Sequence, residues 1–259
     1  MIKKSVAGIF IFLSFSLLGK SVLDNEFKVS PFGNINTSNK DMVILFHGLY
    51  GKLKSLSPIA DFLEKEGYSG INIQYPTASH TVEEISEKYI TPQIESQLQL
   101  LDEVNRLRKE KGEEELKLNF VVHSLGSVIL RYYLKDNKPK SLGKIVFISP
   151  PSHGSQLADI SLLKDLEWLL GPVISQVKTD EDSLVNSLGE PDYRCFILIG
   201  DRSVNSLFSL IISEEDDGVV PLSSARLENC NFSIIEGTDH SSILKDERTF
   251  EKIKNYFNE

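Results

Sequence analysis

The residue best suited to catalysis is a serine that directly follows a buried apolar run. Residues 120–127 read Phe-Val-Val-His-Ser-Leu-Gly-Ser, so a strand pattern leads straight into a helical pattern at Ser124. A serine at a sharp strand-to-helix turn has its hydroxyl raised above the sheet, at the positive end of a helix dipole. Gly126 lets the helix pass close to the strand. We therefore predict that Ser124 is a nucleophile, although Val122 stands where the usual G-x-S-x-G pattern has its first glycine.

A second run that could serve catalysis ends in small residues. Residues 43–51 read Val-Ile-Leu-Phe-His-Gly-Leu-Tyr-Gly, a strand pattern that leads into a tight loop. Such a loop can direct a backbone N–H at the oxyanion that develops when a carbonyl is attacked. We predict that the N–H groups of Leu49 and Leu125 form an oxyanion hole. In the alternative interpretation, the glycines only satisfy the backbone geometry of a turn between a strand and a helix.

An acid and a histidine complete the set. Residues 214–221 read Glu-Glu-Asp-Asp-Gly-Val-Val-Pro, and residues 236–242 read Glu-Gly-Thr-Asp-His-Ser-Ser. A histidine after the last strand can act as general base toward a serine, and an acid can hold its tautomer and stabilise its charged form. We predict a catalytic triad of Ser124, Asp217 and His240, in one of the chain orders known for such triads.

The elements that must position these residues form a repeating alternation. Apolar runs rich in Val, Ile and Phe are separated by longer amphipathic or charged stretches. The apolar runs are residues 42–46, 71–75, 118–122, 144–149, 195–199 and 232–235. Continuous apolar strands separated by helices indicate a parallel sheet with helices on both faces. We therefore predict an α/β fold with a mostly parallel, six-stranded sheet.

The length and composition of the chain fit a single globular domain. The chain has 259 residues, with 41% hydrophobic and 25% charged residues, which excludes disordered, collagenous and coiled-coil proteins. Its formal net charge is −9, and a protein that binds the phosphates of nucleic acids needs a basic patch instead. We therefore predict a single globular domain over residues 41–259 that has no nucleic-acid partner.

The first residues differ from the rest of the chain. Two lysines at positions 3 and 4 precede an uncharged apolar run over residues 5–19, which fits a secretory signal peptide over residues 1–21. The run is short for a membrane span. We predict a secreted or periplasmic protein in which residues 22–40 form an irregular lead-in. Cleavage removes three lysines and no acid, which leaves the mature chain more acidic. This acidity disfavours tight docking on anionic lipids, so we expect any contact with a membrane surface to be transient and any lipid substrate to be bound mainly through apolar contacts.

The chain resembles α/β-hydrolases of the lipase and esterase kind, and among them small bacterial lipases. The likeness runs from about Asp41 to the C-terminus. It also includes Gln-Tyr-Pro-Thr at residues 74–77 and Ser-Pro-Pro-Ser-His-Gly-Ser at residues 149–155. On the family's pattern, the six strands are the third to the eighth, and the first two strands are absent or vestigial. Ser127 also departs from the pattern, because a second glycine often stands there.

The resemblance favours one acid among several. Asp217 fits the family's Asp-Gly-Val-Val-Pro pattern. Asp216 and Glu215 are adjacent to it, however, and Asp201 directly follows an apolar run. These three acids remain alternatives, because the position of a triad acid is set by geometry.

The other four histidines have less direct interpretations. We expect His47 to brace the oxyanion loop and His123 to fill the position before the nucleophile. His153 is expected to pack beneath the site, and His80 to lie in a loop. None of them has the spacing of metal ligands, so we predict no metal, and the triad chemistry requires no cofactor.

Residues 155–190 form a candidate cap. They hold a concentration of leucines and the chain's single tryptophan, Trp168. Such a segment above a hydrolase site can supply an acyl-binding wall or a mobile lid. An ordinary helix packed on the sheet accounts for the same pattern equally well.

The two cysteines flank predicted strands. Cys195 opens one apolar run, and Cys230 lies just before the last one. An oxidising compartment permits a disulfide if the two strands are neighbours, but directly paired parallel strands give poor disulfide geometry. A disulfide and two free buried thiols are both consistent with the sequence.

From these features we predict a serine hydrolase that acts on a small-molecule or lipid ester of a carboxylic acid. Two alternatives remain open. An acyltransferase or a thioesterase uses the same triad and differs in the nucleophile that it admits. A binding protein with the same fold and no activity is the other alternative, and only Val122 favours it. The sequence does not fix the oligomeric state.

Overall fold

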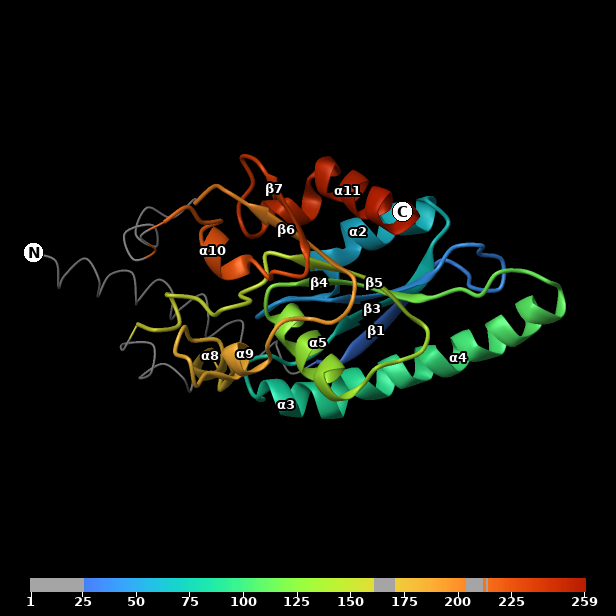
Figure 1. The fold of residues 1–259 in the computed structure, drawn as a ribbon, viewed down its shortest axis with the longest axis horizontal. Coiled ribbons are helices and arrows are strands. Elements are labelled where there is room, and N and C mark those ends of the chain that lie inside the picture. The colour runs from blue at the N-terminus through green and yellow to red at the C-terminus, as the bar shows by residue number, and fades with distance from the viewer. Residues whose placement is uncertain (1–25, 161–170, 204–211, 213) are drawn as a thin grey trace, which may run out of the picture.

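The computed structural model describes residues 26–160, 171–203, 212 and 214–259 (Figure 1). The predicted signal peptide at residues 1–21 lies outside the described residues. Within them, no helix is both long enough and apolar enough to cross a membrane.

One sheet forms the centre of the described structure, and its strands follow the apolar runs of the sequence. The strands are β1 Lys28–Phe32, β2 Met42–Phe46, β3 Ser69–Gln74, β4 Leu118–His123, β5 Leu142–Ile148, β6 Cys195–Gly200 and β7 Asn231–Ile235. Their order across the sheet is β1-β3-β2-β4-β5-β6-β7. β1 is antiparallel to β3, and the other neighbouring pairs are parallel. The predicted α/β fold with a mostly parallel sheet is therefore confirmed.

Part of the N-terminal lead-in, residues 22–40, forms a strand. All six predicted strands are present, but β1 lies within residues 22–40, which were expected to be irregular. One of the two leading strands that we expected to be absent or vestigial is thus present, as the five-residue strand β1. Pro31 explains why the segment can form a strand only at the margin of the sheet, because proline cannot donate a hydrogen bond within a central strand. Most residues of β1 remain accessible to solvent.

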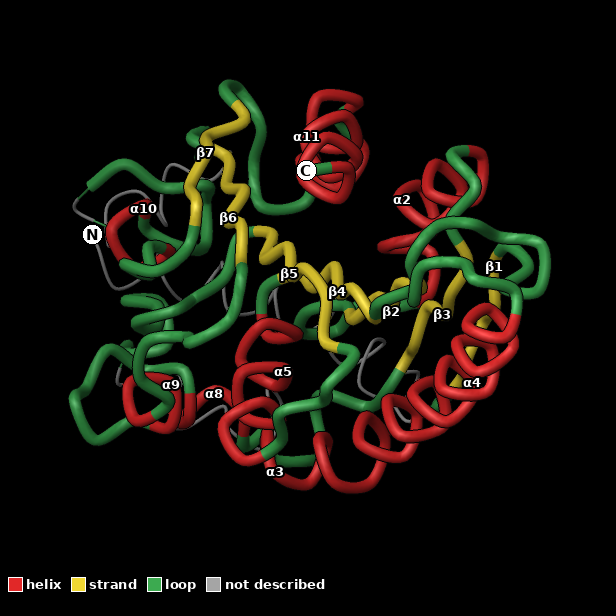
Figure 2. Tube along the Cα trace, turned by 45° about the vertical axis from the view of Figure 1, so that its right-hand side comes forward, coloured by secondary structure: helices red, strands yellow, loops and turns green. Residues whose placement is uncertain are grey.

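Helices cover both faces of the sheet. They are α2 Leu53–Lys65, α3 Val82–Ile85, α4 Thr91–Glu110, α5 Leu125–Asp136, α8 Val173–Gln176, α9 Leu184–Ser187, α10 Leu222–Ala225 and α11 Glu247–Asn258. A π-helical segment, Ser86–Ile90, joins α3 to α4, and a 3₁₀ helix, Ser242–Lys245, precedes α11. Figure 2 shows α2 and α11 on one face, with α3, α4 and α5 on the other.

The core consists of two apolar layers, one on each face. Successive side chains of a strand point to opposite faces. Val121 accordingly belongs to the layer that holds Leu56 of α2 and Ile253 of α11. Val122 belongs to the opposite layer, together with Val128 of α5 and Ile94 of α4.

The strand register brings the carboxyl ends of the parallel strands to one edge. Phe46 of β2 is paired with Val122 of β4, which in turn is paired with Phe147 of β5. At the other side of the sheet, Gly200 of β6 is paired with Ile235 of β7. Loops that follow these five strands therefore meet above the same edge, and all the predicted catalytic residues lie in those loops or at their boundaries.

Candidate active site

Ser124 occupies a strained turn between β4 and α5. Its φ is 52° and its ψ is −122°, and its N–H donates to the carbonyl of Ile148, 2.9 Å away. Val122 is not among the described residues with positive φ, so the turn's unusual conformation is carried by Ser124 itself. A β-branched residue is therefore tolerated where the usual pattern has glycine. Gly126 is required by space, since a Cβ there would lie 2.9 Å from two carbonyl oxygens at the end of β2.

Backbone strain is concentrated at this edge of the sheet. In the described part of the chain, the non-glycine residues with positive φ are Tyr50, Ser124 and Ser149. They follow β2, β4 and β5, which are adjacent in the sheet. Such conformations cost about 1–3 kcal/mol each and gather at functional sites, where the surrounding structure enforces them.

His240 is paired with Asp217. The Nδ1 of His240 lies 2.8 Å from Oδ2 of Asp217, and the backbone N–H of His240 donates to the carbonyl of Asp217 at 2.8 Å. The second carboxylate oxygen, Oδ1, accepts hydrogen bonds from the N–H groups of Val219 and Val220. Asp217 is fully buried. Burial raises the pKa of Asp217, but the attraction and hydrogen bond from His240, with the bond from Val220, outweigh it and hold the pKa below its usual value.

The neighbouring acids make other contacts. Asp216 accepts a hydrogen bond from the N–H of Gly218 at 2.6 Å. Asp201 accepts one from the N–H of Gly237 at 2.6 Å. Geometry therefore separates Asp217 from the alternatives that the sequence left open, because it is the acid whose carboxylate meets the ring of His240.

Two contacts join the nucleophile turn to the other loops. A Cβ on Gly48 would lie 2.7 Å from the Cβ of Ser124, so the loop after β2 touches the side chain of Ser124. The Nε2 of His123 lies 2.9 Å from the carbonyl oxygen of His240, and the centroids of the two rings are 4.7 Å apart. The structure thus brings the predicted nucleophile, base and acid to one edge of the sheet.

One predicted oxyanion donor belongs to the residue that follows Ser124, and the other belongs to the loop after β2, which lies against Ser124 at Gly48. Leu125 is the first residue of α5, where the N–H has no intrahelical acceptor. No described residue accepts a hydrogen bond from the N–H of Leu49 or Leu125. Two unengaged donors near a buried serine are what a developing oxyanion requires.

His47 holds the loop that contains Leu49. Its Nδ1 lies 2.7 Å from the carbonyl oxygen of Gly48, and its Nε2 accepts the N–H of Tyr75 at 3.2 Å. The two rings are stacked, with centroids 4.2 Å apart. Burial lowers the pKa of His47 to about 4, so the ring is neutral at pH 7 and its Nδ1 carries the hydrogen. These contacts fit the expectation that His47 braces this loop.

Residues 149–155 tie the site's loops together. The hydroxyls of Ser152 and Ser155 donate to the carbonyls of Ala225 and Val219, at 3.0 and 2.7 Å. The motif that resembled the family's pattern is therefore a brace for the loop that carries the acid. The prediction for His153 is wrong: its side chain is exposed and lies beside the carbonyl of Arg226 instead of packing beneath the site.

Sequence reasoning missed Arg131 of α5. Its buried guanidinium donates to the carbonyls of Ser152 and Gly189, both at 2.9 Å. The contact with Ser152 fixes the loop after β5 to α5, the helix that begins directly after Ser124. An arginine on an otherwise apolar helix face was the signal available in the sequence, but it did not indicate which loops the side chain binds.

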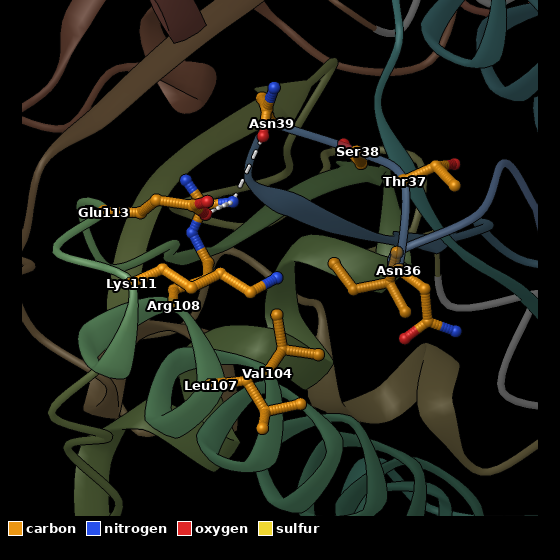
Figure 3. A pocket seen from close by; sticks show the side chains of 10 residues that line it. Asn36, Thr37, Ser38, Asn39, Val104, Leu107, Arg108, Lys111 and Glu113 are labelled. Carbon is orange, nitrogen blue, oxygen red and sulfur yellow. Dashed lines mark hydrogen bonds and ion pairs between the residues drawn. The ribbon is translucent and has the colours of Figure 1, made fainter.

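The amino ends of the strands hold different features. Cys195 and Cys230 form a disulfide at the amino ends of β6 and β7. A pocket of about 150 Å³ lies where the loop before β2 meets the end of α4, and Arg108 there contacts Asn39 and Glu113 (Figure 3). The pocket is lined by Ile35, Asn36, Thr37, Ser38, Asn39, Val104, Leu107, Arg108, Lys111 and Glu113. None of the predicted catalytic residues lines it.

The candidate cap is described only in part. Residues 161–170, which include Trp168 and much of the apolar concentration, lie outside the described residues. The described remainder of residues 155–190 contains α8 and α9. Of the residues that the structure describes, no group of three or more His, Cys, Asp or Glu is arranged to hold a metal ion.

Comparison with known proteins agrees with this architecture. A family model for the alpha/beta hydrolase fold matches residues 41–188. The chain belongs to the alpha/beta-hydrolase family. A triacylglycerol lipase of Pseudomonas fragi is 31% identical over 81 residues, which are 31% of this chain and 27% of that lipase. The match thus spans about a quarter of the lipase.

Solved lipase and esterase structures share the fold of this family member. The mature Bacillus licheniformis lipase BlEst2 is 18% identical with a TM-score of 0.64, and the match covers 89% of this chain and 98% of the lipase. Est1E of Butyrivibrio proteoclasticus is 15% identical with a TM-score of 0.57, over 90% of this chain and 93% of Est1E. Such identities establish the fold alone, and the resemblance to lipases and esterases of this superfamily is confirmed.

Proposed function

We propose that this alpha/beta hydrolase is a serine hydrolase that cleaves carboxylic esters of acyl or lipid type. The observation that carries the proposal is the pair formed by the partly exposed His240 and the fully buried Asp217, which meets the loops around Ser124 at the same edge of the sheet. A serine hydroxyl is a weak nucleophile unless a base removes its proton. The pair supplies such a base together with the acid that orients it.

The chemistry follows from these positions. The Oγ of Ser124 attacks the ester carbonyl carbon while the Nε2 of His240 accepts the hydroxyl proton. The carbonyl oxygen becomes an oxyanion, which the N–H groups of Leu49 and Leu125 stabilise. Collapse of this intermediate expels the alcohol, which takes the proton from His240, and leaves an acyl group on Ser124. Water then attacks the acyl-enzyme, with His240 again as base, and the carboxylic acid is released.

Asp217 stabilises the charged form of His240 at each of these steps. Its carboxylate accepts the Nδ1–H bond of His240, which leaves Nε2 free to take the serine proton. The lowered pKa keeps the carboxylate ionised at neutral pH. The two backbone bonds to Oδ1 prevent its rotation away from the histidine.

Labelling with a fluorophosphonate probe tests the proposal. Such a probe phosphonylates a serine whose hydroxyl is activated by a neighbouring base. The wild type should be labelled, whereas Ser124→Ala should take up no label and should hydrolyse p-nitrophenyl esters more slowly by a factor on the order of 10⁶. Ser57→Ala, which removes a hydroxyl bonded within α2, is the matched control and should keep full labelling. Folded wild type that refuses the probe would contradict the proposal.

The acyl class rests on the partial match to a triacylglycerol lipase. A series of p-nitrophenyl esters from acetate to palmitate locates the preferred chain length. Faster hydrolysis of long chains at an interface would support a lipid substrate, and a preference for acetate in solution would support a small ester.

We also propose that the protein acts outside the cytoplasm. The Cys195–Cys230 disulfide supports this location, because such bonds persist in oxidising compartments. The expected N-terminus of the exported protein follows residue 21, and Edman or mass-spectrometric analysis of that protein checks it. An exported chain that still begins with Met1 would contradict the predicted cleavage.

A further inference from the structure

His123 lies between the proposed nucleophile and the proposed base. It is the last residue of β4 and is buried, with 7% of its surface exposed. Its Nε2 is 2.9 Å from the carbonyl oxygen of His240. A carbonyl oxygen can only accept a hydrogen bond, so Nε2 of His123 carries the hydrogen and donates it. This hydrogen bond fixes the ring of His123 in one tautomer and holds it against His240.

The ring of His123 stays neutral at the pH at which the site would work. Burial is the main cause that lowers its pKa to about 3, and the neighbouring His240 lowers it further. A neutral ring places no charge beside His240 when that residue becomes an imidazolium. The same burial makes the ring a poor acceptor for the serine proton, because protonation of His123 is unfavourable at the lowered pKa.

The sheet alone does not set the distance between Ser124 and His240. Ser124 follows β4, and His240 follows β7, with β5 and β6 between those two strands. The two hydrogen bonds that His240 makes with Asp217 fix it relative to the acid, not to the nucleophile. Among the described residues, the hydrogen bond from His123 is the one that joins His240 to the strand carrying Ser124.

We propose that His123 is a positioning residue that sets the distance between the Oγ of Ser124 and the ring of His240. The inference rests on the proposed roles of those two residues. Proton transfer requires a separation of roughly 2.6–3.2 Å between the heavy atoms, and a displacement of about 1 Å costs on the order of 10²-fold in rate. If the loop that contains His240 were held only by its bonds to Asp217, the distance between His240 and Ser124 would not be fixed.

Two substitutions distinguish the contribution of the hydrogen bond from that of the imidazole ring of His123. In His123→Gln, the amide nitrogen can reach the place of Nε2 and donate to the carbonyl of His240, without a charge. In His123→Asn, the side chain is neutral and polar but too short to reach it. His153→Gln is the matched control, because it changes an exposed histidine outside the site.

Steady-state hydrolysis of p-nitrophenyl butyrate gives the first measurement. The asparagine variant should lose about 10²-fold in kcat with KM unchanged within about twofold, because positioning for proton transfer is lost and ester binding is not. The glutamine variant should recover kcat to within about threefold of wild type. A merely structural role would not be rescued by one donor atom. Equal kcat in the asparagine variant and the wild type would overturn the proposal, and so would glutamine acting no better than asparagine.

Hydrogen exchange gives a second measurement that needs no catalysis. The backbone amides of residues 238–244 should exchange about tenfold faster in His123→Asn than in the wild type, and at the wild-type rate in His123→Gln. Unchanged exchange in both variants would overturn the role of His123 even in an active enzyme. If the wild type is neither labelled nor active while His123→Asn still loosens this loop, the proposed function fails and the positioning contact stands.

Discussion

The two ends of the parallel strands differ in how their residues are held. At the carboxyl ends, Tyr50, Ser124 and Ser149 have positive φ, a conformation that is costly for non-glycine residues. At the amino ends, a disulfide joins Cys195 to Cys230. The molecule thus keeps its strained residues at one edge and a covalent bond at the opposite one.

Two asparagines near the amino ends have hydrogen-bond partners, although the buried hydroxyl of Ser69, the first residue of β3, has none among the described residues. Asn105 of α4 donates to the carbonyl of Leu116 and accepts its N–H, at 2.9 and 2.8 Å. Asn119 of β4 accepts the N–H of Lys144 at 2.7 Å. At the carboxyl ends, by contrast, the N–H groups proposed for the oxyanion have no acceptor among the described residues. Unpaired N–H groups cost stability, and stabilising an oxyanion as proposed requires them. We therefore call the carboxyl ends of the parallel strands the functional edge and the amino ends the structural edge.

Asp217 offers the largest effect on the functional edge. Asp217→Asn should lower kcat by about 10⁴-fold, because the carboxamide cannot stabilise the charged form of His240 and favours the wrong tautomer. Asp216→Asn is the matched control, since asparagine retains an oxygen that can accept the N–H of Gly218. It should lose no more than about tenfold. Steady-state kinetics on p-nitrophenyl butyrate measures both. The reverse order would transfer the role of the acid to Asp216.

The disulfide offers the largest effect on the structural edge. Replacing both cysteines with serine should lower the free energy of unfolding by about 4 kcal/mol, because the bridge spans 35 residues of the chain. Urea unfolding measures this change. The value of kcat should stay within about twofold of wild type well below the midpoint of unfolding, since the bridge lies at the other end of β6 and β7 from His240. Loss of kcat in proportion to stability would show that the two edges are coupled.

The sequence was informative where burial is continuous. Each of the six predicted strands carries a run of apolar residues, and in all of them except β7 most residues are buried, as expected for strands covered on both faces. β1 was missed because its side chains are mostly exposed and Pro31 interrupts its pattern. An exposed margin strand buries too little apolar surface to leave a continuous signal.

Local motifs predicted the candidate site, but contacts between loops could not be read from spacing. Ser124 and His240 were found from short stretches next to strands. Neither the bond from His123 to His240 nor that from Arg131 to Ser152 has a local signature, because each joins a strand or helix to a loop that is distant in the sequence and meets it only after folding. The cysteines show the same limit. Pairing of Phe196 with Asn231 places Cys195 beside Cys230, and the sequence does not fix that register.

The smallest expected effect concerns the buried imidazole of His47. Its pKa is about 4 in the folded protein, against 6.5 for an ordinary histidine. As pH falls below about 6.5, the unfolded chain takes up a proton at this position while the folded protein does not. Proton uptake by the unfolded state then favours unfolding. The stability contributed by neutral His47 is therefore present above pH 6.5 and is lost as pH falls toward 4, at no more than about 1.4 kcal/mol per pH unit.

Replacing His47 tests whether this residue, at the functional edge, causes the loss of stability at low pH. Urea unfolding of the wild type and of His47→Gln between pH 7 and pH 5 measures the slope of stability against pH. The variant should be less stable at pH 7, because its side chain cannot reproduce both the bond to Gly48 and the bond from Tyr75. Its slope should nevertheless be shallower by about one proton, whereas His153→Gln, which changes an exposed ring, should keep the wild-type slope. Identical slopes in all three proteins would show that the buried neutral imidazole of His47 does not contribute to the pH dependence of the free energy of unfolding.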